Sequence, residues 1–141
     1  RFAGLDRVEL AQVPTNIGTG FSPLAILTAD RRSVLYETSA PHQIRVHDIA
    51  SGTEDIIASN AFAPVAAARS NRLAYAHARD PLPTGPSAVW RQASDIVVRD
   101  GVGGADEVWS DAPGRYLPVA WAGDTLLCRG EHRETSHPRR S

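Results

Sequence analysis

One strand pattern occurs twice in full and a third time in part, and it constrains the fold of this 141-residue chain more than any other feature. Each copy is an apolar run, a polar turn and a second apolar run, which is typical of a β-hairpin. The copies lie at 24–36, 65–75 and 119–128. Because repeated units bury their apolar faces against one another, we expect a stack of similar units in place of a single core.

Further strands follow the first two copies and extend each of them to a unit of four. Residues 44–49 alternate apolar and polar side chains, and Gly52 supplies the positive φ that a tight turn after them requires. No segment of helical length has a 3.6-residue period, so the sequence predicts an all-β fold. The predicted strands are 7–13, then 24–29, 33–38, 43–49 and 53–58, then 64–68, 72–78, 95–100 and 106–110, and finally 117–121 and 125–129.

The second unit carries an insertion between its second and third strands. From Tyr75 to Asp100 is 25 positions, against 12 in the first unit, so 13 residues are added within 79–93. Three prolines and a glycine in this segment exclude a regular element and indicate a loop. We interpret it as a candidate binding loop, with Trp90 as apolar anchor and Arg79 and Arg91 as flanking donors. The alternative is a surface excursion in which Trp90 packs back onto its own unit.

Composition excludes some classes of partner. Fifteen arginines, no lysine and 16 acids give a net charge of −1, so no nucleic-acid partner is expected. No apolar run approaches the roughly 20 residues of a membrane span. Cys128 follows two leucines and is expected to be a small buried hydrophobe. Residues 130–141 are polar throughout and are predicted to be a disordered tail.

The sequence contains no recognisable catalytic, cofactor-binding or metal-binding motif. There is no Gly-x-Ser-x-Gly elbow for a serine hydrolase. His42 and His47 are five residues apart, so on a strand they point to opposite faces and make poor joint metal ligands. The glycine-rich segment 101–104 lacks the following helix of a phosphate loop and is read as a hairpin turn. We therefore assign no catalytic residue, cofactor or metal.

Two pairs of residues occupy matching places in the two full units. Asp48 and Asp100 end the third strands, where a carboxylate accepts hydrogen bonds from the backbone of the next turn. Tyr36 and Tyr75 occupy matching places on the second strands. We expect both rings to pack between units. Both pairs are interpreted as structural.

Residues 29–36 and 44–52 together resemble the TolB-like β-propeller repeat. That family's blade typically has a Ser-Pro-Asp-Gly turn, an apolar strand ending in Tyr or Phe, then an Ile-Tyr-Val-x-Asp strand closed by a Gly turn. The corresponding turns of this chain are degenerate, with Ala-Asp-Arg-Arg at 29–32, Arg-Ser-Asn at 69–71 and Ala-Gly-Asp at 122–124. The resemblance implies an incomplete propeller of about two and a half four-stranded antiparallel blades, at 24–60, 61–111 and in part 112–129, after a strand and loop at 1–23. It also suggests a periplasmic or extracellular location.

The resemblance implies a non-catalytic scaffold that binds a protein or a small ligand within a larger protein. Exposed strand edges would be covered by the remaining blades or by self-association. Two alternatives stay open. In the first, the chain is the propeller portion of a prolyl-oligopeptidase-like serine peptidase without its catalytic domain. In the second, it is part of an enzyme whose site lies in the propeller channel.

Overall fold

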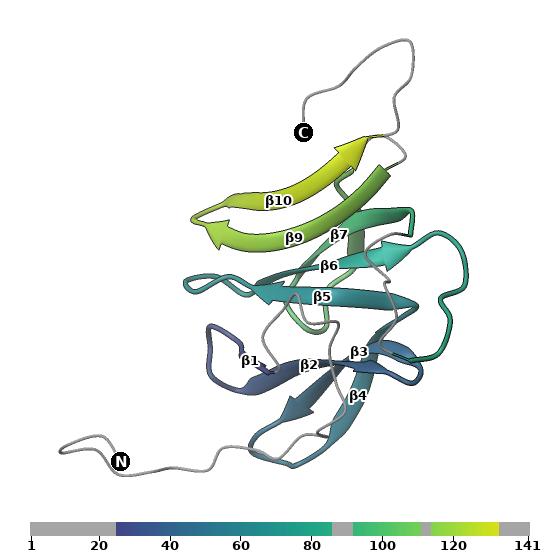
Figure 1. The fold of residues 1–141 in the computed structure, drawn as a ribbon. Coiled ribbons are helices and arrows are strands. Elements are labelled where there is room, and N and C mark those ends of the chain that lie inside the picture. Colours follow the sequence, from purple (N-terminus) through teal and green to yellow (C-terminus); the bar gives the residue numbers. More distant parts are fainter. Residues whose placement is uncertain (1–24, 86–91, 111–113, 133–141) are drawn as a thin grey trace, which may run out of the picture.

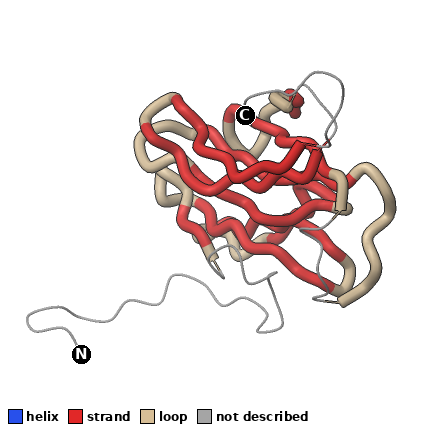
Figure 2. Tube along the Cα trace, turned by 45° about the horizontal axis from the view of Figure 1, so that its top comes forward, coloured by secondary structure: helices blue, strands red, loops and turns tan. Residues whose placement is uncertain are grey.

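The computed structural model describes residues 25–85, 92–110 and 114–132. Within these ranges all regular structure is β-strand (Figure 2), which confirms the all-β prediction. The predicted strand at 7–13 lies outside them. The strands are β1 (Ile26–Leu27), β2 (Ser33–Ser39), β3 (His42–Asp48), β4 (Glu54–Ser59), β5 (Ala61–Ala66), β6 (Arg72–Ala78), β7 (Ser94–Asp100), β8 (Asp106–Val108), β9 (Gly114–Ala122) and β10 (Thr125–His132).

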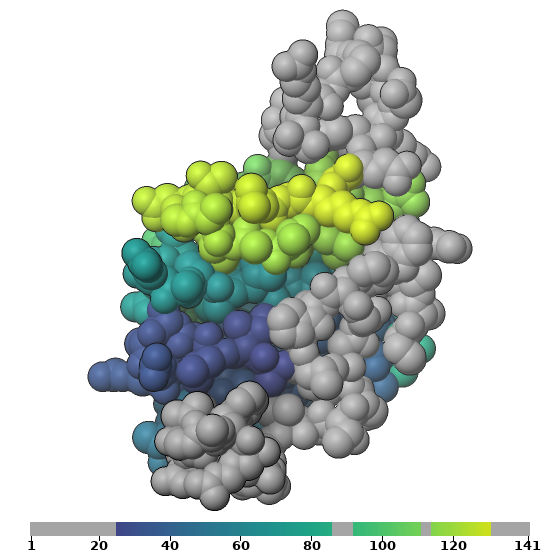
Figure 3. Space-filling model, turned by 60° about the vertical axis from the view of Figure 1, so that its left-hand side comes forward, coloured from purple at the N-terminus to yellow at the C-terminus, as the bar shows by residue number. Residues whose placement is uncertain are grey.

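The strands form three open antiparallel sheets that follow one another along the chain. The first sheet has the order β1-β2-β3-β4, the second β5-β6-β7-β8, and the third is the β9-β10 hairpin. The sheets are stacked in chain order, as the ribbon in Figure 1 and the successive coloured layers in Figure 3 show. We call the contact between the first and second sheets the first junction, and that between the second and third sheets the second junction.

Strand positions agree with the sequence prediction, and the differences lie at the ends. β5 begins at Ala61, three residues before its predicted start, because a one-residue link at Asn60 joins it to β4. β10 extends to His132, so the segment predicted as a disordered tail from 130 begins inside a strand. Residues 133–141 of that predicted tail lie outside the described residues.

The first junction is an apolar core built by alternate residues of facing strands. Leu35, Ile44 and Val46 of the first sheet pack against Leu73 and Tyr75 of the second. Tyr75 therefore packs between units as predicted. Tyr36 is also fully buried, but alternation places it on the face of the first sheet that points away from this core.

The second junction repeats this arrangement one sheet further along. Ala74, Ile96 and Val98 come from the opposite face of the second sheet and pack against Tyr116, with Trp121 and Leu126 at the margin. The central sheet is therefore apolar on both faces. No helix capable of crossing a membrane occurs among the described residues.

Asn60 connects the first sheet to the second and to the start of the insertion. Its backbone has φ of 55°, a left-handed conformation that Asn tolerates better than most residues. Its side-chain amide donates to the carbonyl oxygens of Ala78 and Asp80, and its Oδ1 accepts from the N–H of Leu82, over 2.8 to 3.1 Å. Its N–H bonds the carbonyl of His42. One side chain thus fixes where the second unit and the insertion begin.

The two full sheets share a polar network that the sequence analysis did not identify. In the first sheet Glu54 accepts a hydrogen bond from the Tyr36 hydroxyl at 2.9 Å and lies 3.3 Å from Nδ1 of His47. In the second sheet Asp106 pairs with Arg99 Nε at 2.8 Å, and its interaction with the Tyr75 phenol raises the pKa of Tyr75. The three positions match by strand register.

In both networks an acid at the start of the fourth strand therefore joins a tyrosine and a basic side chain on the second and third strands. Burial raises the pKa of both tyrosines, and the hydrogen bonds to Glu54 and Asp106 raise it further. Burial disfavours the charged form of Asp106, but hydrogen bonds from Arg99 and Tyr75 outweigh this effect and lower its pKa.

Replacing Asn60 with Ala should destabilise the chain by about 2 kcal/mol, because three partly exposed hydrogen bonds are lost and Ala disfavours positive φ. Urea unfolding followed by circular dichroism measures this loss. Asn71→Ala is the matched control, since Asn71 is exposed in a turn and should change stability by less than about 0.5 kcal/mol. Equal effects of the two substitutions would contradict the role given to Asn60.

Stability should fall at alkaline pH because of the buried tyrosines. Above a pH of about 10 an unfolded chain releases its phenol protons, whereas the folded chain keeps those of Tyr36 and Tyr75, so the free energy of unfolding falls as pH rises. Tyr75→Phe should reduce this loss, measured by urea unfolding between about pH 9 and pH 11. Tyr36→Phe should reduce it by less, because the larger shift belongs to Tyr75. An unchanged pH dependence in both variants would refute the assignment.

Candidate functional site

The insertion predicted as a binding loop is described in part. Residues 86–91, which include Trp90 and Arg91, lie outside the described residues, so the proposed apolar anchor and one donor stay predictions. Residues 79–85 run without regular structure from the end of β6 toward the first sheet, where the N–H of Gly85 bonds the carbonyl of Ser39. Leu82 packs against the buried cluster of Phe62, Ala63, Ala76 and Ala78. The loop thus begins with contacts to both sheets.

Arg79, the third predicted loop residue, is engaged at the base of the loop. Its Nη2 lies 2.5 Å from Oδ1 of Asp95, and its Nε lies 3.2 Å from Oδ2. Asp95 also accepts a hydrogen bond from Ser110 at 3.0 Å. Burial opposes ionisation of Asp95, but the bonds from Arg79 and Ser110 outweigh it and lower its pKa. The Arg79 guanidinium is therefore paired with Asp95, and this ion pair joins the two ends of the loop.

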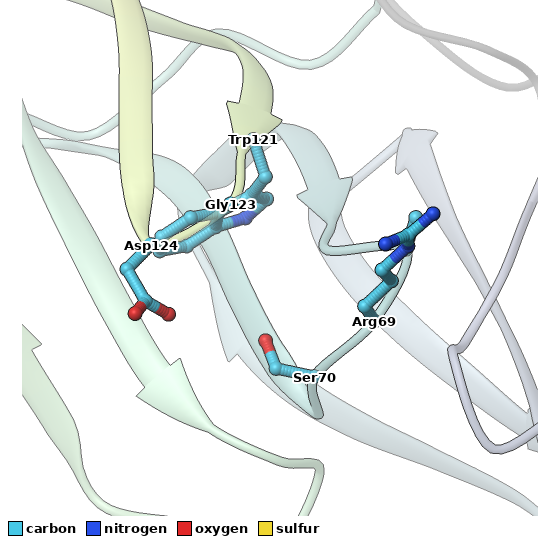
Figure 4. A pocket seen from close by; sticks show the side chains of 6 residues that line it. Arg69, Ser70, Trp121, Gly123 and Asp124 are labelled. Atoms are coloured by element: carbon cyan, nitrogen blue, oxygen red, sulfur yellow. The ribbon is translucent and has the colours of Figure 1, made fainter.

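A cleft lies at the opposite end of the strands, at the second junction. It has a volume of about 230 Å³, and two turns line it, the one between β5 and β6 and the one between β9 and β10. Figure 4 shows the Ser70 hydroxyl pointing toward the indole of Trp121, with Arg69 and Asp124 on opposite sides of that ring. Gly123, with φ of 62°, makes the tight turn that places Asp124 beside the indole. We call this hollow the junction cleft.

Trp121, which lines the junction cleft, belongs to a cluster with a second tryptophan and an arginine. The rings of Trp109 and Trp121 meet edge to face, with centroids 5.8 Å apart and an interplanar angle of 75°. The guanidinium carbon of Arg72 lies 5.6 Å from the Trp109 centroid and 6.0 Å from the Trp121 centroid. Nε of Arg72 also pairs with Asp100 at 3.2 Å. Such edge-to-face and cation–π contacts hold the indole of Trp121 in a defined orientation.

The first junction has different side chains at the same three places. Strand register matches Arg72 to Ser33, because each lies opposite the last residue of the third strand. Trp121 matches Ala66, since each pairs with a leucine that follows the turn. Trp109 matches Ile57, the residue that follows the exposed Ile56 or Val108 of the fourth strand. Where the first junction has small or aliphatic side chains, the second has an arginine and two tryptophans.

Trp121 combines stabilising ring contacts with one unfavourable polar group. Its Nε1 atom is buried, and no described residue accepts a hydrogen bond from it. A buried donor without a partner is unfavourable by about 1–3 kcal/mol, and an aliphatic side chain in its place would carry no such donor. A position that departs from a local rule of this kind is one at which a functional role is expected.

Sequence reasoning missed the junction cleft because its parts are far apart in the chain. In the sequence Arg69, Ser70 and Asp124 lie in polar turns between apolar runs, a position that indicates no binding role. The signal was present in the repeat. Arg69 stands where the first turn has Asp30, which accepts hydrogen bonds from Thr28 Oγ1 and the N–H of Arg32. A register-aware comparison of the three copies would have identified the substituted positions.

Other sequence predictions have mixed outcomes. Asp48 accepts hydrogen bonds from the N–H and hydroxyl of Ser51, which lower its pKa and confirm its turn-capping role. Its counterpart Asp100 instead pairs with Arg72, so the capping prediction is wrong for the second unit.

The prediction of a buried Cys128 is also wrong, because its thiol lies on the exposed third sheet, which is only two strands wide.

The histidines of β3 lie on opposite faces of the first sheet, as alternation requires. His42 is buried, and neither of its ring nitrogens has a hydrogen-bond partner among the described residues. His47 contacts Glu54 on the other face. Across 25–85, 92–110 and 114–132, no three His, Cys, Asp or Glu side chains gather closely enough to hold a metal ion.

Comparisons of the chain with protein families, with curated proteins and with solved structures found no match.

Replacing Trp121 with Leu should change the free energy of unfolding by only about 1 kcal/mol, because the lost aromatic contacts are offset by removal of the unpaired donor. Leu35→Ala, in the fully buried first junction, should lower stability by about 2–5 kcal/mol. Urea unfolding of both variants makes the comparison. A loss at Trp121 as large as that at Leu35 would mean that the indole is a core residue.

Proposed function

We propose that this chain is a non-catalytic binding scaffold made of consecutive blades of a TolB-like β-propeller. The observation that carries the proposal is the junction cleft, whose Trp121 contacts Trp109 and Arg72 at the second junction, where the first junction has small and aliphatic residues. Four-stranded antiparallel sheets that pack face to face in chain order are the building plan of a propeller, which supports this assignment.

The third sheet supports the view that further blades are part of the scaffold. It has two strands where the first and second sheets have four, and β10 has no described strand on its outer edge. Val119 and Leu127 are exposed on this hairpin, at 57% and 50%. Open edges and exposed apolar side chains favour pairing with another strand, so more blades or a second copy of the chain would cover them.

A rigid scaffold with a specialised junction suits recognition of a ligand or a partner protein. The two turns that line the cleft are short and belong to closed hairpins, so little conformational entropy is lost when a ligand binds between them. The 79–93 insertion starts at the other end of the strands and remains a second candidate surface through Trp90 and Arg91, with Arg79 paired to Asp95 at its base. The scaffold thus offers binding positions at both ends of its sheets.

A fragment screen observed by NMR tests the binding role without a known ligand. The chain has three tryptophans, so a ¹⁵N-labelled sample gives three indole N–H signals, assigned with Trp109→Phe and Trp121→Phe. We expect a subset of small ring fragments to shift the Trp121 signal in a saturable manner, and Trp121→Leu to abolish these shifts. A diverse library in which no fragment affects Trp121 or Trp109 would contradict the proposal.

A further inference from the structure

The junction cleft restricts its ligand by the hydrogen-bonding properties of its walls. Arg69 can only donate hydrogen bonds, the carboxylate of Asp124 can only accept them, and the Ser70 hydroxyl can do both. Trp121 adds an apolar ring surface between them. A ligand that satisfies all four must present donors and acceptors close together around an apolar face.

The charges at the junction cleft disfavour a ligand with a net charge. Arg69 and Asp124 lie on opposite sides of the indole, so an anion gains one contact and is repelled at the other, as is a cation. The indole rings already have a guanidinium over them, since Arg72 contacts both Trp109 and Trp121. A cationic ligand would therefore bring a second positive charge close to the Arg72 guanidinium. A neutral ligand meets neither penalty.

Size and functional groups favour one class among the neutral ligands. The volume of about 230 Å³ is below the roughly 300–1,000 Å³ of sites for drug-sized ligands, so the junction cleft suits a single ring. A proline ring would stack on Trp121 but has no donor for Asp124, which would lose hydration without a replacement. A sugar ring has hydroxyls that both donate and accept, and a C–H face that packs on an indole.

We infer that the junction cleft binds one pyranose ring of a neutral saccharide, an inference that rests on the proposed binding function. The ring stacks on Trp121, neighbouring hydroxyls donate to the Asp124 carboxylate and accept from the Arg69 guanidinium, and Ser70 bonds a further hydroxyl. Trp109 and Arg72 act from behind as positioning residues, because they hold the indole in place.

Titration of the ¹⁵N-labelled full chain with methyl glycosides tests this inference. The probes are the methyl glycosides of glucose, mannose, galactose and N-acetylglucosamine, with a proline-rich peptide and free glutamate and arginine as comparisons. We expect at least one glycoside to shift the Trp121 indole and the Gly123 and Asp124 amides with a dissociation constant on the order of 1 mM. The peptide and the amino acids should leave these signals unchanged.

Two exposed side chains allow variants that keep the fold intact. Arg69→Ala and Asp124→Ala should each weaken glycoside binding at least tenfold, while signals of the first junction stay in place. Arg32→Ala in the first turn and Asp55→Ala on β4 remove the same charges from exposed positions away from the cleft, and should leave the affinity unchanged.

The outcomes separate this inference from the binding role itself. If no glycoside shifts Trp121 but ring fragments or the peptide do, the saccharide assignment is overturned and the scaffold role stands. If a glycoside binds equally well to the Arg69 and Asp124 variants, the ring sits elsewhere and the inference is also overturned. If no fragment and no glycoside shifts the Trp121 indole signal, both the saccharide inference and the proposed function fail.

Discussion

The apolar character of both faces of the second sheet determines the rest of this structure. Leu73 and Tyr75 face the first sheet, whereas Ala74 and Ile96 face the third. A sheet that is apolar on both sides must be covered on both sides, because each exposed face would leave several large side chains in water. The neighbouring units are therefore required for stability, and the chain folds as a stack whose junctions carry most of the packing.

This arrangement separates two kinds of junction residue. At the first junction the matched positions hold Ser33, Ile57 and Ala66, which meet the packing requirement with small or aliphatic side chains. At the second junction they hold larger and more polar side chains, one of which has a buried donor without a described partner. Because both junctions belong to one chain and one strand pattern, the first acts as an internal reference for what packing alone needs.

The repeated polar network explains how each four-stranded sheet is held together at one end. A tyrosine, an acid and a basic side chain join the second, third and fourth strands in both full units. The basic member is His47 in one sheet and Arg99 in the other, and Arg99 also donates to the carbonyl of Ile57 across the first junction. The two sheets thus differ in the basic residue but share the tyrosine and the acid that join their strands.

The sequence alone determined the local structure, because strand alternation and turn residues are short-range properties. It placed strands such as β2, β3, β6 and β7 almost to the residue, together with the turn at Gly52 and the insertion after Ala78. Only the tertiary structure decided which turns lie next to each other and form a cleft. Arg69 and Trp121 are 52 positions apart, and no local pattern relates them, so only the stacking of the second and third sheets brings them to one cleft. The burial of a side chain likewise depends on which neighbouring sheet covers it, and for that reason Cys128 is exposed despite its apolar neighbours.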